Sequence, residues 1–247
     1  MTIPQPTQRY KVEWDETRSE YCVRFPDIPE VRLTTFTEND IDDMIKVYNE
    51  PSIGEWTFRR PFPYGPADAQ WAVDNFIPRY QEALEEIDKA AKTGAKPLVR
   101  GHFPFPILRY VPTGNDSGRL DGLGLRDGQM LGGVYVWPYA STDAEAAEML
   151  ARPPAEQTFE VAYDLAEVAR RKGLGKRMLT AALEAWVESL GIGMAKATIE
   201  TRNTASNALI RSCGFELVEN IVTAWPEEKG GGERAGARFV WKNPHLQ

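Results

Sequence analysis

A strand, a short turn and a helix follow one another over residues 158–190, and this unit constrains the fold more than any other feature. Thr158–Leu165 alternates polar and apolar side chains, as a strand does. The turn reads RRKGLG over Arg170–Gly175, and Leu174–Leu190 then has apolar residues at helical spacing until Gly191 ends it. A strand that passes through a tight turn into a helix is typical of mixed α/β proteins.

The turn has the chemistry of an anion-binding site. The first turn of a helix leaves backbone N–H groups unpaired and carries the positive end of the helix dipole. Gly173 and Gly175 let a ligand approach that backbone closely, which suits a pyrophosphate. The surrounding side chains are basic: Arg170, Arg171, Lys172, Lys176 and Arg177. The pattern alone is weak, because it lacks the Ser or Thr of a P-loop and the third glycine of a dinucleotide fingerprint.

Further strands and helices are predicted on both sides of this unit. Strands are expected at 30–36, 101–111, 129–139, 194–201, 215–225 and 233–242, and helices between Thr37 and Pro51, at 66–92 and at 204–213. Residues 1–29 are polar and rich in proline, which indicates an arm with a short hairpin. Residues 112–128 indicate a long turn, and residues 141–157 an insertion that contains a short helix. The fold class is therefore mixed α/β (α+β).

Charge and residue usage argue against several classes of protein. The net charge of −7 and the isoelectric point near 5.1 disfavour nucleic-acid binding, which needs a net basic face. The two cysteines, Cys22 and Cys213, form no disulfide framework, and no cluster has the spacing of metal ligands. No apolar run reaches the roughly 20 residues that cross a membrane. We therefore expect a soluble cytoplasmic protein that binds no metal, no nucleic acid and no membrane.

The turn and its neighbours resemble the GNAT superfamily of N-acyltransferases. Arg170–Gly175 fits the R/Q-x-x-G-x-G/A signature of that superfamily. Asn203–Ser206 opens the next helix and Cys213–Phe215 ends it, as in GNAT proteins. Phe159–Tyr163 resembles the strand that precedes the turn in the RimJ/RimL-like branch, the ribosomal-protein N-terminal acetyltransferases.

The resemblance covers roughly residues 30–242 and is strongest in the second half of the chain. It implies a single GNAT domain over 30–247, with a mixed, mostly antiparallel central sheet of about seven strands flanked by about four helices. The segments 1–29, 112–128 and 141–157 lie outside it.

The resemblance also implies acetyl-CoA as the cosubstrate. The turn would hold the CoA pyrophosphate through backbone N–H groups, and Val161–Leu165 would pair with the pantetheine amides, one N–H polarising the thioester carbonyl. The implied cofactor-binding residues are Val161, Tyr163, Leu165, Arg170, Arg171, Lys172, Gly173, Leu174, Gly175, Lys176, Asn203 and Ser206.

Acyl transfer to an amine requires a group that takes a proton from the amine, whose ordinary pKa is near 10. Glu160 is the first candidate, directly or through water, because a carboxylate within a core strand is costly unless it faces a wet cleft. An equally weighted alternative is that Glu160 is a structural hydrogen-bond partner. Asp164 and Glu200 are weaker candidates for the base.

The proton donor to the leaving thiolate departs from a common GNAT pattern. Many GNAT enzymes have a tyrosine four residues before the glycine that ends this helix, whereas this chain has Ile210 there. Ser206 is then the nearest hydroxyl and a second candidate catalytic residue, and Asn203 would bind the pantetheine arm. The simpler alternative for Asn203 and Ser206 is helix capping. Cys213 is interpreted as a packing residue, and His102 as a structural histidine.

An aromatic loop is the candidate acceptor site. Its candidate substrate-binding residues are Trp56, Phe58, Arg59 and Tyr64, with the 225–234 hairpin opposite. The alternative is that these rings close the core and that Arg59 and Arg60 are surface charges. The expected partners are acetyl-CoA and a primary amine, either a small molecule or a protein N-terminus, bound by a monomer or homodimer. The competing hypotheses are a non-catalytic acyl-CoA sensor or partner-binding module, and a nucleic-acid binder centred on 170–177.

Overall fold

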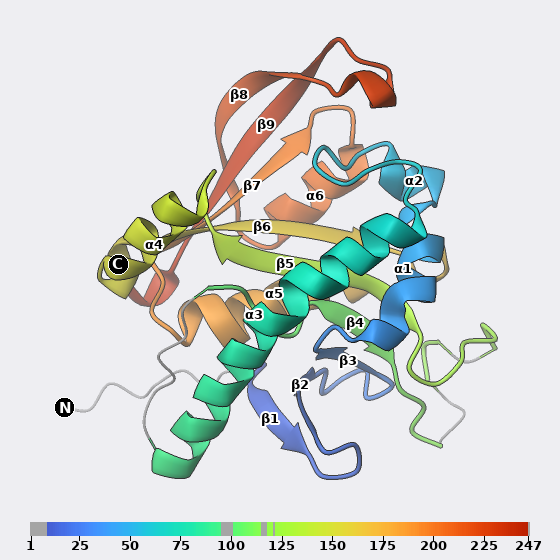
Figure 1. The fold of residues 1–247 in the computed structure, drawn as a ribbon, viewed down its shortest axis with the longest axis vertical. Coiled ribbons are helices and arrows are strands. Elements are labelled where there is room, and N and C mark those ends of the chain that lie inside the picture. Colours follow the sequence, from blue (N-terminus) through green and yellow to red (C-terminus); the bar gives the residue numbers. More distant parts are fainter. Residues whose placement is uncertain (1–8, 95–100, 115–117, 121, 247) are drawn as a thin grey trace.

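A computed structural model describes residues 9–94, 101–114, 118–120 and 122–246. Within these ranges nine strands form one sheet in the order β1-β2-β3-β4-β5-β6-β7-β9-β8 (Figure 1). The strands are β1 (Val12–Asp15), β2 (Glu20–Arg24), β3 (Val31–Thr34), β4 (Ile107–Tyr110), β5 (Met130–Pro138), β6 (Thr158–Leu165), β7 (Met194–Glu200), β8 (Glu216–Ala224) and β9 (Glu233–Lys242). The helices are α1 (Ile41–Tyr48), α2 (Pro51–Gly54), α3 (Pro66–Thr93), α4 (Asp143–Ala151), α5 (Leu174–Ala182) and α6 (Thr204–Ser212).

One strand pair in the sheet differs from the others. All neighbouring strands are antiparallel except β6 and β7, which are parallel. Their pairing runs only from Thr158–Met194 to Glu160–Lys196, whereas β6 stays paired with β5 as far as Leu165. Figure 1 shows β7 rising away from β6. The sheet therefore splits along the second half of β6.

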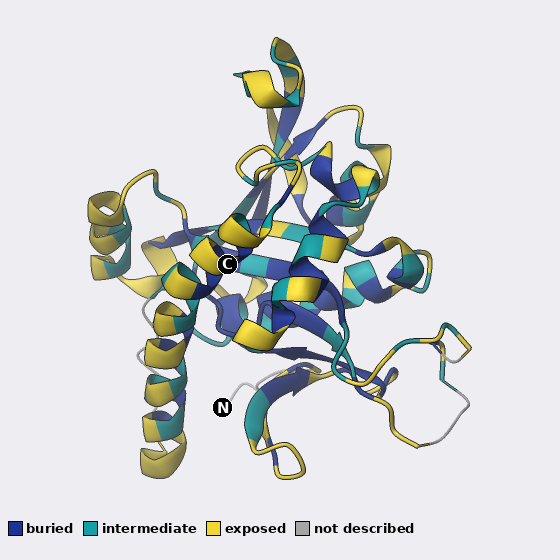
Figure 2. Ribbon diagram, turned by 45° about the vertical axis from the view of Figure 1, so that its right-hand side comes forward, coloured by how far each residue is buried: buried dark blue, intermediate teal, exposed yellow. Residues whose placement is uncertain are grey.

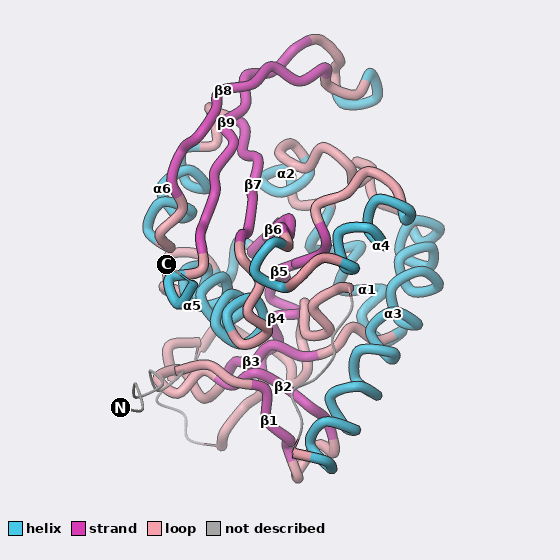
Figure 3. The backbone as a smooth tube through the Cα atoms, turned by 90° about the vertical axis from the view of Figure 1, so that its left-hand side faces the viewer, coloured by secondary structure: helices cyan, strands magenta, loops and turns pink. Residues whose placement is uncertain are grey.

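Helices cover both faces of the sheet. Figure 3 shows α5 and α6 on one side and α1 and α3 on the other. The side chains of Val134, Phe159 and Val161 point to the α5 side and belong to the larger buried cluster with Leu179 and Trp186. The opposite face is covered by a second cluster, which includes Tyr48, Tyr64, Val73 and Tyr80. Figure 2 shows the central strands buried and the outer side of α3 exposed.

Local sequence explains where the helices that bound the later site begin. Pro66 occupies the first turn of α3, where its missing N–H is not needed, and the Asp68 carboxylate accepts the Gly65 N–H at 2.8 Å. Gly173 precedes α5 with a φ of 74°, a left-handed conformation that glycine adopts without strain. The predicted helix over 174–190 is found as α5 followed by a π-helical segment over Leu183–Glu188.

The described part of residues 1–29 joins the sheet and does not form the separate arm that the sequence predicts. The predicted hairpin exists as β1 and β2, but β2 pairs with β3, so the sheet has nine strands instead of about seven. Tyr10, Phe25 and Ile28 are at most 2% exposed and belong to the larger core. Strands this short give little periodicity of their own, and their place depends on pairing with β3. Residues 1–8 lie outside the described part.

The strand predicted at 101–111 is shorter than expected. Only Ile107–Tyr110 forms a strand, because Pro104 and Pro106 have no N–H to donate to a neighbour. Phe103 still donates its N–H to the Val136 carbonyl at 2.8 Å, so the segment follows β5 irregularly. Of the predicted 112–128 turn, residues 115–117 and 121 lie outside the described part.

Candidate active site

A cavity of about 1400 Å³ lies where the sheet splits. It is lined by β5, β6 and β7, by the first turns of α5 and α6, by the α1–α3 layer, and by the hairpin that joins β8 to β9. Every site residue predicted from the sequence except Lys172 lines it. The fold thus brings the turn, Glu160, the α6 start and the aromatic loop into one chamber.

The split leaves one edge of β6 facing the cavity. The Thr158 carbonyl accepts a hydrogen bond from Tyr139, which directly follows β5, and Ala166 donates one to Leu131, so the backbone groups of even-numbered residues point to β5. Backbone direction alternates along a strand, so Val161, Tyr163 and Leu165 direct theirs to the side where pairing with β7 has ended. This edge is suited to pair with amides of an extended ligand.

The turn at the start of α5 closes one end of that edge. Leu174, Gly175 and Lys176 bring the unpaired N–H end of the helix to the cavity, and Arg171 lines it nearby. Arg170, predicted to bind the cofactor, has a structural partner as well: its Nε donates to the Leu165 carbonyl at 2.8 Å.

Two other basic residues in or near the turn, Lys172 and Arg177, do not line the cavity. Arg177 is held by Asp27, its Nη2 lying 2.6 Å from Oδ2. Lys172 does not line the cavity, and its carbonyl accepts a hydrogen bond from Arg119 at 3.4 Å. The predicted anion site would therefore depend on backbone N–H groups and on fewer cations than the sequence suggests.

Two adjacent arginines pair with two carboxylates on the α3-facing side of β6. Arg59 Nη1 lies 3.2 Å from Glu160 Oε2, and the Arg59 side chain is 64% exposed. Arg60 Nη2 lies 2.8 Å from Asp164 Oδ2, and the Asp164 side chain is 4% exposed. Glu160 is therefore the carboxylate with access to the open cavity, whereas Asp164 belongs to a buried ion pair.

The buried pair contacts Tyr48 and Tyr135, which no sequence pattern connects with it. The Arg60 guanidinium carbon lies 3.5 Å from the centre of the Tyr48 ring, and the Tyr48 and Tyr135 hydroxyls are hydrogen-bonded to each other. Burial raises the pKa of Asp164, and the Arg60 charge opposes that rise. Burial likewise raises the pKa of both phenols. The alternative that Arg60 is a surface charge is thus wrong.

The α6 start presents a hydroxyl pair. Asn203 caps the helix, since its Oδ1 accepts the Ser206 N–H at 3.1 Å, which is the simpler of the two alternatives for this residue. The Ser206 hydroxyl lies 2.7 Å from the Tyr163 hydroxyl, and both residues line the cavity. The Tyr163 side chain was not singled out in the sequence, although strand alternation places it on this face.

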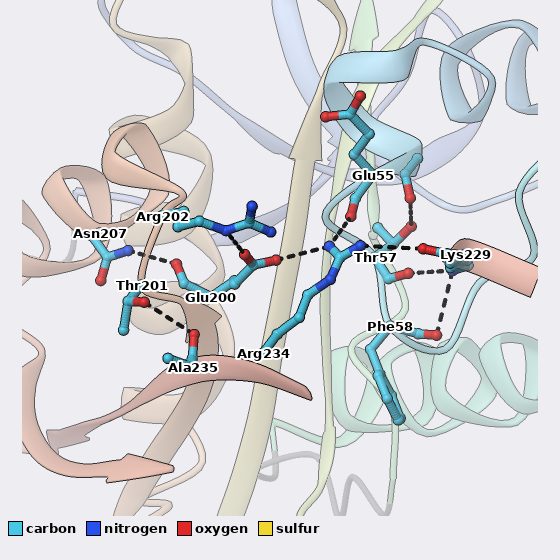
Figure 4. A network of polar contacts seen from close by, with 11 residues as sticks. Glu55, Thr57, Phe58, Glu200, Thr201, Arg202, Asn207, Lys229, Arg234 and Ala235 are labelled. Atoms are coloured by element: carbon cyan, nitrogen blue, oxygen red, sulfur yellow. Dashed lines mark hydrogen bonds and ion pairs between the residues drawn. The ribbon is translucent and has the colours of Figure 1, made fainter. Parts of the chain in front are cut away.

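The third predicted carboxylate, Glu200, is a structural residue. Its Oε1 lies 2.5 Å from Arg202 Nε and its Oε2 lies 3.0 Å from Arg234 Nη1. Arg234 also donates to the Glu55 carbonyl at 3.2 Å, which links β9 to the loop after α2 (Figure 4). Both carboxylate oxygens of Glu200 are therefore engaged in ion pairs with guanidiniums.

The β8–β9 hairpin is fastened to the aromatic loop. Lys229 Nζ donates to the carbonyls of Thr57, Phe58 and Arg60, as Figure 4 shows for the first two. The Phe58 and Trp225 rings meet edge to face at 5.5 Å. Partial burial lowers the pKa of Lys229. The predicted opposition of the loop and the 225–234 hairpin is therefore found, with direct contact between them.

Metal and membrane features are absent from the part of the chain that the structure describes. Among those residues, no group of three or more His, Cys, Asp and Glu side chains is placed to hold a metal ion. None of the described helices combines the length and the apolar character that a membrane span needs.

Known proteins resemble this chain both in sequence, over residues 108–216, and in fold. Residues 108–216 match the family described as acetyltransferase (GNAT) domain, and a search of curated protein sequences gave no match. The ribosomal-protein-S5-alanine acetyltransferase of Vibrio fischeri has a similar structure, with 11% identity, a TM-score of 0.56, and coverage of 92% of this chain and 98% of that chain.

Two further solved structures carry ligands. The spermidine N-acetyltransferase of Vibrio cholerae, in complex with CoA and spermine, is 14% identical with a TM-score of 0.54, covering 88% of this chain and 98% of that chain. The phosphinothricin acetyltransferase of Sinorhizobium meliloti, in complex with acetyl-CoA, is 18% identical with a TM-score of 0.52, covering 87% and 89%. At these identities the likeness concerns the fold. The chain therefore has the GNAT fold, and its residues 108–216 match the GNAT acetyltransferase domain.

Proposed function

We propose that the protein transfers an acetyl group from acetyl-CoA to a primary amine. The observation that carries this proposal is the open edge of β6, which leads from the α5 N-terminus to Glu160 within one cavity. An extended thioester bound along this edge places its phosphates at the turn and its acyl group near Glu160. Val161 and Tyr163 supply backbone groups to the pantetheine amides and to the thioester carbonyl.

The proposed reaction is a direct transfer. Glu160 takes a proton from the ammonium form of the acceptor, directly or through one water, and the neutral nitrogen attacks the thioester carbonyl carbon. A β6 backbone N–H stabilises the oxyanion. The tetrahedral intermediate then collapses, the C–S bond breaks, and the thiolate takes a proton from the Ser206 hydroxyl. The Ser206 oxygen regains a proton through water from the positively charged nitrogen, which leaves a neutral amide. Tyr163 orients that hydroxyl through the 2.7 Å contact.

Glu160→Gln tests the base. We expect turnover at pH 7 to fall about 100-fold or more, the usual contribution of a general base, with CoA affinity unchanged. The deficit narrows toward pH 10, because an amine with a pKa of about 10.4 then loses its proton to solvent. The measurement is free-thiol release against pH, with Glu216→Gln, an exposed carboxylate on β8, as the matched control. Unchanged turnover at every pH would clear Glu160 of this role.

Lys229→Met tests whether the fastened hairpin shapes the acceptor side. A hydrogen bond from a charged group contributes about 1.5–3 kcal/mol, so its loss should raise the acceptor KM about 10-fold or more. The CoA dissociation constant should stay the same, because the turn and β6 are untouched. Lys242→Met, at the exposed far end of β9, is the control. A rise in CoA dissociation constant equal to the rise in KM would contradict an acceptor-side role.

A non-catalytic acyl-CoA sensor is the second candidate function. The observation that favours it is Ile210, which is fully buried where many GNAT enzymes place a tyrosine proton donor. Tight CoA binding without amine-dependent thiol release across a panel of amines would support the sensor function and contradict the proposed acetyl transfer.

Several finer assignments belong to the same proposal. We place the chain in the RimJ/RimL-like branch, on the likeness of Phe159–Tyr163 and of the opening residues to that branch. Its proposed setting is the cytoplasm, as a monomer or homodimer without a metal. Between a protein N-terminus and a small amine, we favour the small amine, because Lys229 and Arg234 close the hairpin over the cavity.

A further inference from the structure

Four rings form one wall of the cavity, and we call Trp71, Phe76, Tyr80 and His102 the aromatic wall. Along α3 the Trp71 and Phe76 centroids are 5.8 Å apart and the Phe76 and Tyr80 centroids 6.1 Å apart. His102 meets Phe76 at 5.9 Å and Tyr80 at 6.5 Å. The four rings contact one another in series on the α3 side of the sheet. The turn before α5 lies on the opposite side of the sheet (Figure 3).

Core packing accounts for Tyr80 and Phe76, which belong to or pack against the second cluster, but not for Trp71. The Trp71 side chain is 60% exposed, although it lines the cavity and lies on a helix whose other rings are packed. An exposed indole beside further rings loses the free energy that burial would provide, unless a ligand covers it. The wall carries no charge at neutral pH, because burial lowers the pKa of His102 to about 4.

The cavity offers no surplus of negative charge. Glu160 pairs with Arg59, and Asp164 pairs with Arg60. Glu200 is held by two arginines. The fourth acidic residue in the lining, Asp68, accepts the Gly65 N–H at the start of α3. Three of these four carboxylates are thus already paired with guanidiniums, so a polycationic acceptor would find few carboxylates to receive its additional charges.

The wall and the candidate base lie on the same side of the sheet. Trp137 is directly opposite Glu160 in the β5–β6 pair, and directly opposite residues direct their side chains to one face. Tyr135, two residues before Trp137, contacts Tyr48 of α1 on that face. Trp137, Glu160 and the aromatic wall all line the cavity. A flat body on the wall and an amine at Glu160 would therefore occupy the same cavity on the same face of the sheet.

We propose that the acceptor is a primary amine joined by a short aliphatic chain to an aromatic ring, without a further charge. This proposal rests on the proposed acetyl transfer. The ring packs on the aromatic wall, chiefly on Trp71, and the amine points to Glu160. An aromatic ring on the acceptor is favoured because it would bury the exposed Trp71 side chain. A second positive charge on the acceptor would gain little, because Glu160, Asp164 and Glu200 are already ion-paired.

The test compares phenethylamine, butylamine and spermidine as acceptors for the wild type, Trp71→Ala and Trp14→Ala, by free-thiol release from acetyl-CoA. Trp14 is a matched control, since it is 45% exposed on β1 and lies outside the cavity lining. We expect phenethylamine to exceed both other amines at least about 10-fold in kcat/KM, in line with the burial of one ring. Trp71→Ala should remove the advantage of phenethylamine, Trp14→Ala should retain it, and the affinity for acetyl-CoA should be the same in all three proteins.

The outcomes separate this proposal from the reaction itself. Thiol release with spermidine or butylamine but no preference for phenethylamine overturns the acceptor class and leaves the acetyl transfer standing. Thiol release with none of the amines, at saturating acetyl-CoA, counts against the acetyl transfer. Sedimentation is measured in parallel: a wild-type dimer that Trp71→Ala converts to a monomer would assign the aromatic wall to a subunit interface and overturn the proposal.

Discussion

Gly173→Trp should weaken CoA binding by about 100-fold or more, equivalent to about 2.7 kcal/mol. Gly173 lies directly before α5 and lines the cavity, and an indole there would occupy the space that the proposed site leaves for the pyrophosphate. A Cβ at this position would also lie 2.6 Å from Arg177 Nη1, so that side chain must move. Isothermal titration with CoA measures the effect.

Gly191→Trp is the control for backbone strain. Gly191 has a φ of 73°, against 74° for Gly173, and a Cβ there meets nothing within 4 Å. It follows the same helical segment at its opposite end and does not line the cavity. Both variants should therefore lose a similar amount of stability, of order 1 kcal/mol, from the left-handed conformation. Equal CoA affinity in the two variants would remove the turn from the donor site.

Arg60→Met should lower the free energy of unfolding by about 3–5 kcal/mol, the usual effect of removing one partner of a buried ion pair. Asp164 is then left buried with no guanidinium, and the stacking of Arg60 on Tyr48 is lost. Arg59→Met is the adjacent control, because the Arg59 side chain is 64% exposed and such pairs contribute about 0–1 kcal/mol. Urea unfolding of both variants measures the difference.

The pH dependence of Arg60→Met has a definite sign. Burial already raises the pKa of Asp164, and without Arg60 nothing comparable opposes that rise. A carboxyl whose pKa is higher in the folded than in the unfolded state favours folding in acid, and this advantage is lost as pH rises through the folded pKa. The stability deficit of the variant should therefore be small near pH 4 and larger at pH 8. A deficit independent of pH would assign the loss to packing alone.

The double variant Arg60→Met/Asp164→Asn separates charge from shape. With both charges removed, the deficit should be smaller than that of Arg60→Met, because no unpaired ion stays buried. A deficit equal to the sum of the two single variants would mean that Arg60 and Asp164 do not interact in solution.

The second half of the fold follows from local sequence. β6, the turn, α5 and α6 each have a strong period and a glycine or a capping residue at the boundary, so their order is visible without tertiary information. The interpretation of Cys213 as a packing residue agrees with the structure as well, since its side chain packs against the larger core. By contrast, β1 and β2 are short, and only their pairing with β3 assigns them to the sheet.

The sequence by itself determined that a strand, a glycine-containing turn and a helix follow one another, because each of these depends on neighbours within about ten residues. Only the tertiary structure decided what Arg59 and Arg60 do. Adjacent in sequence, they differ because one faces the open cavity at Glu160 and the other is buried against Asp164 and Tyr48. Burial and ion pairing between residues about a hundred positions apart depend on how the sheet and α1–α3 pack, which local periodicity does not encode.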